Sequence, residues 1–454
     1  MIGLDLPERV HIVGVGGHGM SGLAKLLAQA GHRVTGSDLK PGRVMTTLEA
    51  LGVETWVGHR PEAAAAADLL VISSAVPDRD PEVRAATAAG IPVWERPRLL
   101  TEICSRMPAL GATGTHGKTT TSAMLVTALR ALGRDPSFMV GGQLSDLNTN
   151  AHIGEPGLFV LEADEAFGTF LDLALAGLIV TNIEPDHLDF YETVERLEAA
   201  FADVSRRVAG PVVACVDDPG ASRLIDTVPS VVPYGTSTDA AWRIEDVEHA
   251  PGEISFTLAH GAERLPVTVP RPGIHIARDA AGVLALLGEM GLDLPAAAAG
   301  LAGFAGVRRR FEVRLRRRGI VVIDDYAHLP AEVATTIATA HMDHPGRVVA
   351  VFQPARYTRT ARLAVEFGRA LAAADRVIVC GIYAGGEAPI PGVTGRLIAR
   401  AAAEAGGDVG YIARRADIAA GVVAEARPGD MVLLMGSGDI TAVADEMASL
   451  LGDR

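Results

Sequence analysis

The stretch Gly111-Ala-Thr-Gly-Thr-His-Gly-Lys-Thr-Thr-Thr121 predicts a phosphate-binding loop between a strand and a helix. It follows an apolar segment and precedes Ser122-Ala-Met-Leu-Val-Thr-Ala-Leu, which can form a helix. Such a loop turns its backbone N–H groups toward a phosphate chain at the helix N-terminus. Ala112 stands where the P-loop pattern has its first glycine, and Gly114 and Gly117 follow inside the loop. The middle of the chain is therefore expected to be an α/β nucleotide-binding domain.

Lysine usage supports this interpretation. The chain contains 41 Lys plus Arg, but its only lysines are Lys25, Lys40 and Lys118. A compact ammonium at the end of the loop indicates a task that a guanidinium cannot perform. Lys118 can reach the β- and γ-phosphates of a nucleotide, and Thr119 can hold Mg²⁺. The alternative, a Gly/Thr-rich turn before a helix, leaves the lysine unexplained.

Composition limits the remaining possibilities. At 454 residues the chain is expected to form two to four domains. Its net charge of −14 argues against nonspecific binding to nucleic acid or to an anionic membrane. The three cysteines have no metal-ligand spacing and indicate a reducing compartment. No apolar run is long enough to span a bilayer, and no secretory signal is evident, so a cytoplasmic location is expected.

A second glycine loop lies near the start of the chain. A short strand at Val10–Val13 is followed by Gly14-Val-Gly-Gly-His-Gly19, a helix from about Ser21, and a strand at Arg33–Asp38. This order predicts a Rossmann-like unit whose loop approaches a diphosphate. Taken alone, the pattern fits a nicotinamide enzyme, a nucleotide-sugar site or a tight turn equally well. The unit ends near residue 107, which is short for a dehydrogenase domain that binds two cofactors.

Polar residues follow two apolar strands after the P-loop. The first strand ends in Glu162-Ala-Asp-Glu165, and the second leads into Asn182-Ile-Glu-Pro-Asp-His-Leu-Asp189. Oxygen ligands at strand ends beside a P-loop predict a Mg²⁺ site, with solvated loop acids as the alternative.

Two further features follow in the chain. An alternating segment at 240–270 predicts a small antiparallel element. The basic turn 306–311 is either a solvated charge run or part of the nucleotide site.

A third α/β unit begins near residue 313. Its predicted strands are Gly319–Asp325, Arg347–Phe352, Arg376–Cys380 and Asp430–Met435. Tyr326-Ala-His328 follows the first of them, at the edge where α/β sheets carry their chemistry.

Together these motifs resemble the Mur ligase family over almost the whole chain, and the resemblance is to its alanine-adding branch. The matching segments are Val13–Gly22, Thr113–Thr120, Glu162–Glu165, Asn182–Asp189, Gly306–Phe311, Asp324–His328, Phe352–Pro354, Arg356–Thr360, Ile382–Ala384 and Gly436–Ile440. Several relatives support a metal with a carbamylated lysine. No lysine follows Lys118 here, which fits the alanine-adding branch.

The resemblance implies three α/β domains: a Rossmann-like UDP-sugar domain (1–107), a central P-loop ATPase domain (108–312) and a Rossmann-like amino-acid domain (313–454). It implies an ATP- and Mg²⁺-dependent ligase of peptidoglycan precursor synthesis. Such an enzyme joins the carboxylate of UDP-N-acetylmuramate to an amino acid, L-alanine foremost, through an acyl phosphate. The implied partners are small molecules only, with no nucleic acid or membrane, and the expected oligomeric state is monomer or homodimer.

The resemblance also assigns roles to individual residues. The expected catalytic residues are Lys118, Glu162, His187, Arg309 and His328, and the expected Mg²⁺ ligands are Thr119, Glu162 and His187. ATP would contact Gly114, Thr115, His116, Gly117, Lys118, Thr119, Thr120, Asp279, Arg309 and Asp325. The UDP-sugar would contact Gly14, Gly16, Gly17, Gly19, Met20, Ser21, Asp38, His59, Ser73 and Ser74. The amino acid would contact Tyr326, His328, Arg356 and Arg359.

The chain departs from the family pattern at a few positions. Ala166 and Phe167 replace a serine and an aspartate, Leu329 and Ala355 replace histidines, and Ile276 and Asp279 occupy places of asparagines expected near adenine. Because of these changes, an alternative hypothesis is that the protein is a specialised relative that uses a different amino acid or acyl substrate. More remote alternatives are a nicotinamide-dependent dehydrogenase and an inactive nucleotide-binding protein.

Overall fold

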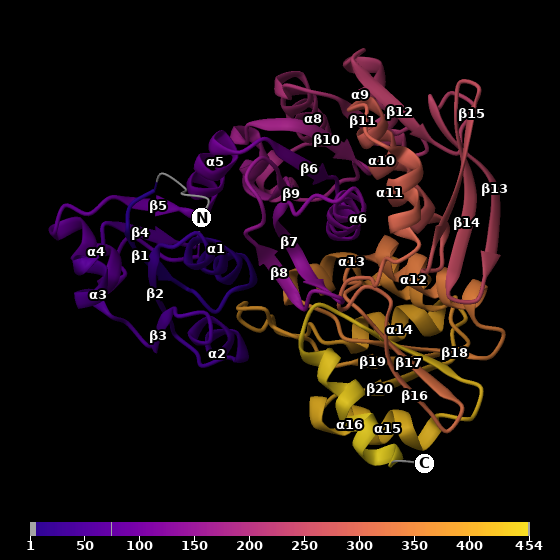
Figure 1. The fold of residues 1–454 in the computed structure, drawn as a ribbon. Helices are drawn as coiled ribbons and strands as arrows, with labels where there is room; N and C mark the ends of the chain where they lie inside the picture. Colours follow the sequence, from indigo (N-terminus) through magenta and orange to yellow (C-terminus); the bar gives the residue numbers. More distant parts are fainter. Residues whose placement is uncertain (1–5, 74, 453–454) are drawn as a thin grey trace. The chain divides into compact units, whose positions relative to one another are not determined.

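The computed structural model describes residues 6–73 and 75–452, which fold into two compact units. The second unit contains Glu248–Ile254, Pro270–Ile274 and the chain from Gly306, and the first contains the rest. Three β-sheets flanked by helices are visible in Figure 1: two in the first unit and one in the second. Within the described residues, no helix combines the length and apolar character needed to cross a bilayer.

The first sheet has five parallel strands in the order β3-β2-β1-β4-β5, the order of a Rossmann-like unit. The order in which strands are added to the sheet reverses between β1 and β4, and the loop after β1 opens at that switch point. The strands are β1 (Arg9–Val13), β2 (Arg33–Asp38), β3 (Glu54–Val57), β4 (Leu69–Ile72) and β5 (Val93–Glu95). The helices are α1 (His18–Gln29), α2 (Arg43–Glu49), α3 (Pro61–Ala66), α4 (Pro81–Ala88) and α5 (Arg96–Arg106).

The second sheet has ten strands in the order β15-β14-β13-β12-β11-β10-β6-β9-β7-β8. The predicted antiparallel element, β13 to β15, extends this sheet at one edge. The strands are β6 (Ala109–Thr113), β7 (Ser137–Leu144), β8 (Thr149–His152), β9 (Phe159–Glu162), β10 (Leu175–Val180), β11 (Val212–Cys215), β12 (Val231–Gly235), β13 (Trp242–Ala250), β14 (Glu253–His260) and β15 (Glu263–Val269). The helices are α6 (Lys118–Ala131), the 3-10 segment η1 (Ala166–Asp172), α7 (Leu188–Tyr191), α8 (Val194–Arg207), α9 (Pro219–Thr227), α10 (Ile274–Glu289) and α11 (Leu294–Leu301).

One hydrophobic core joins the first two sheets. It runs from residues of β1 and α1 through α5 to β6, β9, β10 and α8 without interruption. Lys25 on α1 is buried, and its Nζ donates to Asn150 Oδ1 on β8 at 2.8 Å. Because the core is continuous, the two predicted N-terminal domains form a single compact unit.

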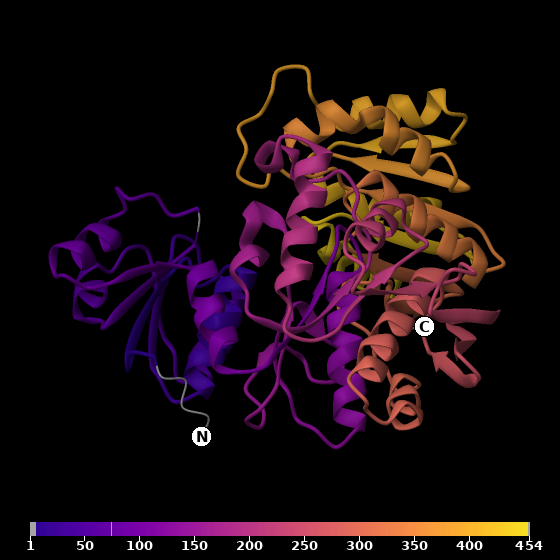
Figure 2. The same cartoon turned by 90° about the horizontal axis from the view of Figure 1, so that it is seen from above.

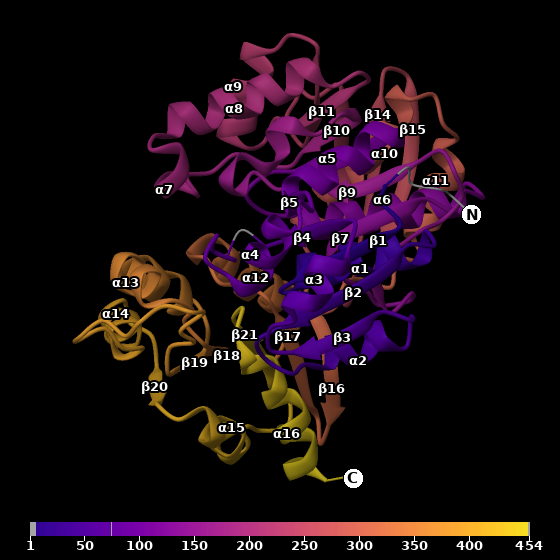
Figure 3. The ribbon, with the colours of Figure 1, turned by 90° about the vertical axis from the view of Figure 1, so that its left-hand side faces the viewer.

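The sheet of the second unit has helices on both faces (Figures 1 and 2). β17 and β21 lie side by side, with the antiparallel strand β16 at the edge (Figure 3). The strands are β16 (Glu312–Arg317), β17 (Ile320–Asp325), β18 (Val348–Phe352), β19 (Arg376–Cys380), β20 (Val409–Ile412) and β21 (Met431–Met435), in the order β16-β17-β21-β18-β19-β20. The helices are α12 (Pro330–Asp343), α13 (Tyr357–Leu371), α14 (Arg396–Glu404), α15 (Ile418–Glu425) and α16 (Ala442–Leu451), with 3-10 turns η2 (Arg415–Asp417) and η3 (Asp439–Thr441).

Candidate active site

The P-loop connects the end of β6 to the start of α6, as the sequence predicts. Gly114 and Gly117 have φ angles of +130° and +83°, in the region that favours glycine. A Cβ on Gly117 would also lie 2.9 Å from Oδ1 of the buried Asp279 on α10. This places Asp279, a predicted ATP residue, directly beside the loop.

We expect Gly117→Ala to weaken ATP binding and to lower the melting temperature. The left-handed conformation costs about 1–2 kcal/mol for alanine, and the added Cβ crowds the Asp279 carboxylate. The KM for ATP and the thermal unfolding curve measure the two effects. Gly133→Ala is the matched control, since Gly133 has φ +73° with open space around it at the far end of α6. Equal KM values for the two variants would contradict the expectation.

Residues at the end of β10 hold the loop in place. The His116 N–H donates to Asn182 Oδ1 at 2.8 Å, and Thr181 Oγ1 and Asn182 Nδ2 donate to the His116 carbonyl at 2.6 and 3.0 Å. Thr115 and Glu184 bond reciprocally through the Thr115 hydroxyl. The sequence placed Asn182 at a strand end but did not predict that it organises the P-loop.

Lys118 begins α6 and is nearly buried. Its Nζ donates to the Gly114 carbonyl at 2.7 Å and to both oxygens of Glu165 at 3.0 and 2.9 Å. Burial lowers the Lys118 pKa, but Glu165, Asp164 and Glu162 outweigh it, so the net pKa is raised. Burial raises the pKa of Glu165 despite the neighbouring lysine. Lys118 is thus a charged ammonium at the loop. It pairs with Glu165, to which the sequence analysis assigned no individual role.

Two oxygen donors converge beside the lysine. Thr119 Oγ1 donates to Glu162 Oε2 at 2.8 Å, and the Gly141 N–H donates to the same oxygen at 2.8 Å. A hydroxyl and a carboxylate in contact at the end of a P-loop fit the oxygen preference of Mg²⁺. Thr120 is half-buried in the first turn of α6.

His187 lies at the start of α7 with a left-handed backbone, φ +52°. Its Nε2 is 3.7 Å from Asp186 Oδ2, and its ring centroid is 6.4 Å from that of Phe167. Phe167 is also left-handed, at φ +53°, and is 62% exposed, with its ring edge-on to Phe190. Left-handed phenylalanine is strained, and such strain is common at functional sites. The metal role of His187 stays a prediction.

The N-terminal glycine loop closes on the end of β2. The Gly16 N–H donates to Asp38 Oδ2 at 3.0 Å, and the Gly14 N–H donates to the Ser37 carbonyl at 2.8 Å. Gly17 caps α1, which contains Gly19 and the buried Met20 and Ser21. At the end of β4, the Ala75 N–H donates to the hydroxyl of Ser73, whereas Ser74 lies outside the described residues.

His59 belongs to a buried polar network around Glu82. The Glu82 carboxylate accepts hydrogen bonds from His11, the Arg60 N–H and Ser37, and lies 3.3 Å from His59 Nδ1. Burial raises the Glu82 pKa, but these partners outweigh it and lower the pKa to about 2. His59, Asp80 and Glu82 are close enough to share a cation, yet both Glu82 oxygens already have donors.

We expect Glu82→Gln to destabilise the protein above about pH 4.5. A pKa lowered from 4.5 to about 2 corresponds to about 3 kcal/mol of stability for this buried group. The folded-state pKa is the lower one, so this stability is complete above the unfolded pKa and is lost as the pH falls toward 2. The gap in melting temperature between wild type and variant should therefore shrink on acidification. Glu62→Gln, an exposed control on α3, should show no gap; a pH-independent gap would contradict the assignment.

In the second unit, Arg309 bonds to the turn after β21. Its Nη2 donates to the carbonyls of Gly436 and Gly438 at 2.5 and 3.2 Å, and its guanidinium lies 4.9 Å from the Tyr326 ring centroid. Asp325 at the end of β17 accepts the N–H groups of Phe311 and Ala327, and burial raises its pKa. Arg309 and Asp325 both form hydrogen bonds within the second unit, and their contacts with ATP stay predictions.

The predicted amino-acid residues lie after β17 and β18. His328 Nδ1 lies 3.1 Å from both the Tyr326 carbonyl and Glu332 Oε2, an arrangement that leaves Nε2 as the acceptor nitrogen of the neutral ring. Arg356 caps α13 at φ +66°, and its N–H donates to the Tyr383 carbonyl. Arg359 lies in the first turn of the same helix.

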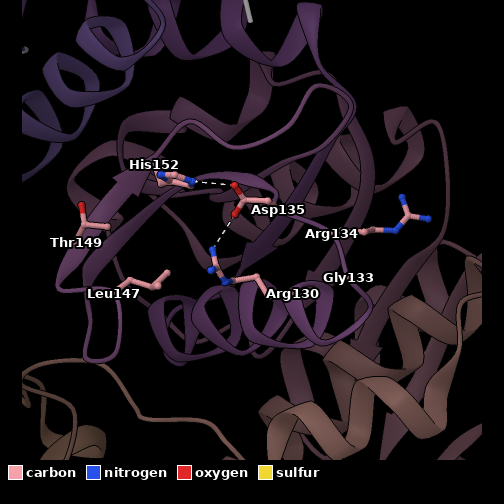
Figure 4. A pocket seen from close by; sticks show the side chains of 7 residues that line it. All are labelled: Arg130, Gly133, Arg134, Asp135, Leu147, Thr149 and His152. Atoms are coloured by element: carbon pink, nitrogen blue, oxygen red, sulfur yellow. Dashed lines mark hydrogen bonds and ion pairs between the residues drawn. The ribbon is translucent and has the colours of Figure 1, made fainter. Parts of the chain in front are cut away.

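A separate surface hollow lies at the far end of α6 (Figure 4). There Asp135 accepts bonds from Arg130 and His152 at 2.7 and 3.2 Å. The helix separates this hollow from Lys118 by roughly 20 Å, at 1.5 Å per residue. It contains none of the predicted site residues.

Three family profiles match the chain: "Mur ligase family, catalytic domain" at residues 9–107, "Mur ligase middle domain" at 112–287 and "Mur ligase, glutamate ligase domain" at 309–438. A UDP-N-acetylmuramate–L-alanine ligase of Mycolicibacterium vanbaalenii is 43% identical, over 98% of this chain and 97% of its own. The chain belongs to the Mur ligase family. As a Mur ligase it is an ATP-dependent ligase, and the predicted family is confirmed.

Other relatives agree. A UDP-N-acetylmuramate–L-alanine ligase of Myxococcus xanthus is 41% identical, over 98% of this chain and 95% of its own. The crystal structure of a UDP-N-acetylmuramate–alanine ligase of Thermotoga maritima has a TM-score of 0.85 at 28% identity, covering 97% of this chain and 98% of that one. The predicted three-domain α/β Mur ligase fold is therefore confirmed, whereas the boundaries 1–107, 108–312 and 313–454 stay predictions.

Proposed function

We propose that this Mur ligase joins L-alanine to the carboxylate of UDP-N-acetylmuramate in the cytoplasm, using ATP and Mg²⁺, in peptidoglycan precursor synthesis. The relatives that are 41–43% identical over nearly the full chain support these substrates. The observation that carries the ATP chemistry is the convergence of Lys118, Thr119 and Glu162 at the P-loop.

Lys118 would neutralise charge on the transferring phosphoryl group, after exchanging Glu165 for phosphate oxygens. Thr119 and Glu162 would hold Mg²⁺, which withdraws charge from the phosphate oxygens when bound. A carboxylate oxygen of the sugar acid attacks the γ-phosphorus, and ADP leaves. The amino group of L-alanine then attacks the acyl carbon, and phosphate leaves as the amide forms.

Residues of the second unit would bind the amino acid. Arginine binds a carboxylate through two parallel hydrogen bonds, so Arg356 and Arg359 suit the free carboxylate of alanine. His328 would take the proton that the amine loses, because its Nδ1 side faces Glu332 and the Tyr326 carbonyl, leaving Nε2 as the base.

Phosphate release with UDP-N-acetylmuramate, ATP and each amino acid in turn tests the proposal, with product masses recorded. We expect L-alanine to give the highest kcat/KM. Turnover led by another amino acid would instead support the specialised relative. The exposed, left-handed Phe167 beside His187 favours that second candidate, because it would suit a larger or less polar substrate.

A further inference from the structure

We propose that the ring of Phe167 forms an apolar wall that keeps water from the acyl phosphate during ligation. The proposal rests on the proposed function, whichever amino acid supplies the amine, and it adds a shielding residue to the groups named there. Phe167 lies in η1, the 3-10 segment that directly follows the strand-end acids Glu162–Glu165.

Phe167 combines two features that bring the fold little benefit. Its φ of +53° is in the left-handed region, which phenylalanine rarely adopts because of the clash of its Cβ with the backbone. Its ring is 62% exposed, so it buries little apolar surface. Phe311 is also left-handed, but its ring packs against the core of the second unit. Strain without burial indicates that Phe167 serves a ligand.

The turn around Phe167 is held by hydrogen bonds and packing. The Glu165 carbonyl accepts the Gly168 N–H at 3.0 Å and the Tyr191 hydroxyl at 2.6 Å. Gly168 is left-handed as well, and a Cβ there would lie 3.2 Å from two carbon atoms of the Phe190 ring. These contacts fix the backbone on both sides of Phe167, so its ring projects from a defined position.

The same turn is anchored to the P-loop lysine. Both Glu165 oxygens accept hydrogen bonds from Lys118 Nζ at 3.0 and 2.9 Å, and Asp164 Oδ1 lies 3.7 Å from the same nitrogen. The ring centroid of Phe167 lies 6.4 Å from that of His187, a predicted Mg²⁺ ligand. Phe167 therefore lies beside the place where the γ-phosphoryl group would be transferred.

Phe190 extends the apolar surface. Its ring is 44% exposed and lies edge-on to Phe167, with the two centroids 6.2 Å apart. It also packs edge-on against the buried Tyr191, with centroids 4.9 Å apart. A water molecule beside two adjoining rings loses hydrogen bonds that it has in bulk solvent. The two phenylalanines thus disfavour water at the edge of the site.

An acyl phosphate can react with water as well as with the amine. Water would attack the acyl carbon, the bond from that carbon to the bridging oxygen would break, and phosphate would leave. The sugar acid would be regenerated as its carboxylate, the released proton would pass to solvent, and one ATP would be lost as ADP and phosphate. Excluding water suppresses this side reaction. An apolar wall does so without reacting itself.

Phe167→Ala tests the wall through the ratio of phosphate to amide. With UDP-N-acetylmuramate, ATP, Mg²⁺ and L-alanine, we expect about one phosphate per amide in the wild type and about two or more in the variant. The excess phosphate should disappear when UDP-N-acetylmuramate is omitted. Phe167→Tyr keeps the ring and should restore a ratio of about one. Leu51→Ala, which shortens a 41% exposed side chain after α2, is the control and should match the wild type.

Phe167→Gly separates shielding from folding. Glycine adopts a left-handed φ without steric cost, so this variant should keep the wild-type melting temperature within about 2 °C and still release excess phosphate.

Two results would overturn the wall: about one phosphate per amide in both Phe167→Ala and Phe167→Gly, or excess phosphate in the absence of the sugar acid. Either result would leave the proposed function intact, because the wild type would still form the amide. A wild type that forms no amide from UDP-N-acetylmuramate and any amino acid would overturn the proposed function, and the wall with it.

Discussion

Replacing Lys118 with alanine should abolish ligation: we expect kcat to fall roughly a thousandfold or more. The ammonium is the cation that the P-loop would present to the transferring phosphoryl group. The other two lysines do not belong to this loop: Lys25 lies on α1 and is bonded to Asn150, and Lys40 follows β2. Lys118→Arg should be equally inactive, because a planar guanidinium does not replace a compact ammonium at this nearly buried position.

Folding must be separated from chemistry in this experiment. Removing Lys118 leaves the buried Glu165 without its partner, which destabilises the native state unless the carboxyl takes up a proton. The double variant Lys118→Ala/Glu165→Gln should recover the melting temperature without recovering activity. Lys40→Ala, at an exposed position, should leave kcat unchanged. A Lys118 variant that keeps a tenth of the wild-type kcat, as a rough limit, would contradict this role.

Glu162→Gln should lower kcat by about a hundredfold at fixed Mg²⁺ and raise the Mg²⁺ concentration needed for half-maximal rate. The amide oxygen can still accept from Thr119 and the Gly141 N–H, so the fold should be retained while the charge is lost. Mg²⁺ titration of the initial rate measures both effects.

Glu155→Gln, an exposed change in the same part of the chain, is the control for that titration. Unchanged Mg²⁺ dependence in Glu162→Gln would exclude Glu162 as a ligand. A loss of activity that excess Mg²⁺ restores would instead fit weakened metal binding.

The strands and loops of the site could be predicted because they depend on local sequence. The P-loop glycines need φ angles that few other residues adopt, and the acids of Glu162–Glu165 follow an apolar strand. The pairing of Lys118 with Glu165 joins residues 47 positions apart, and no local pattern specifies it. The hydrogen bonds between Asn182 and His116 of the P-loop also join distant positions of the chain, and no local pattern specifies them.

Other features depend on tertiary packing. The two N-terminal domains form one unit because α5 and α1 share a core with β6 and β9, which periodicity cannot reveal. Phe167 is left-handed although phenylalanine disfavours that region, so a sequence pattern would not place it there.

The most direct test follows a heavy-oxygen label from the carboxylate of UDP-N-acetylmuramate during a reaction with ATP, Mg²⁺ and L-alanine. The account predicts the amide product, equal amounts of ADP and phosphate, and one labelled oxygen in the released phosphate, since the carboxylate is phosphorylated before the amine attacks. ATP hydrolysis without amide formation, or unlabelled phosphate beside the amide, would contradict it.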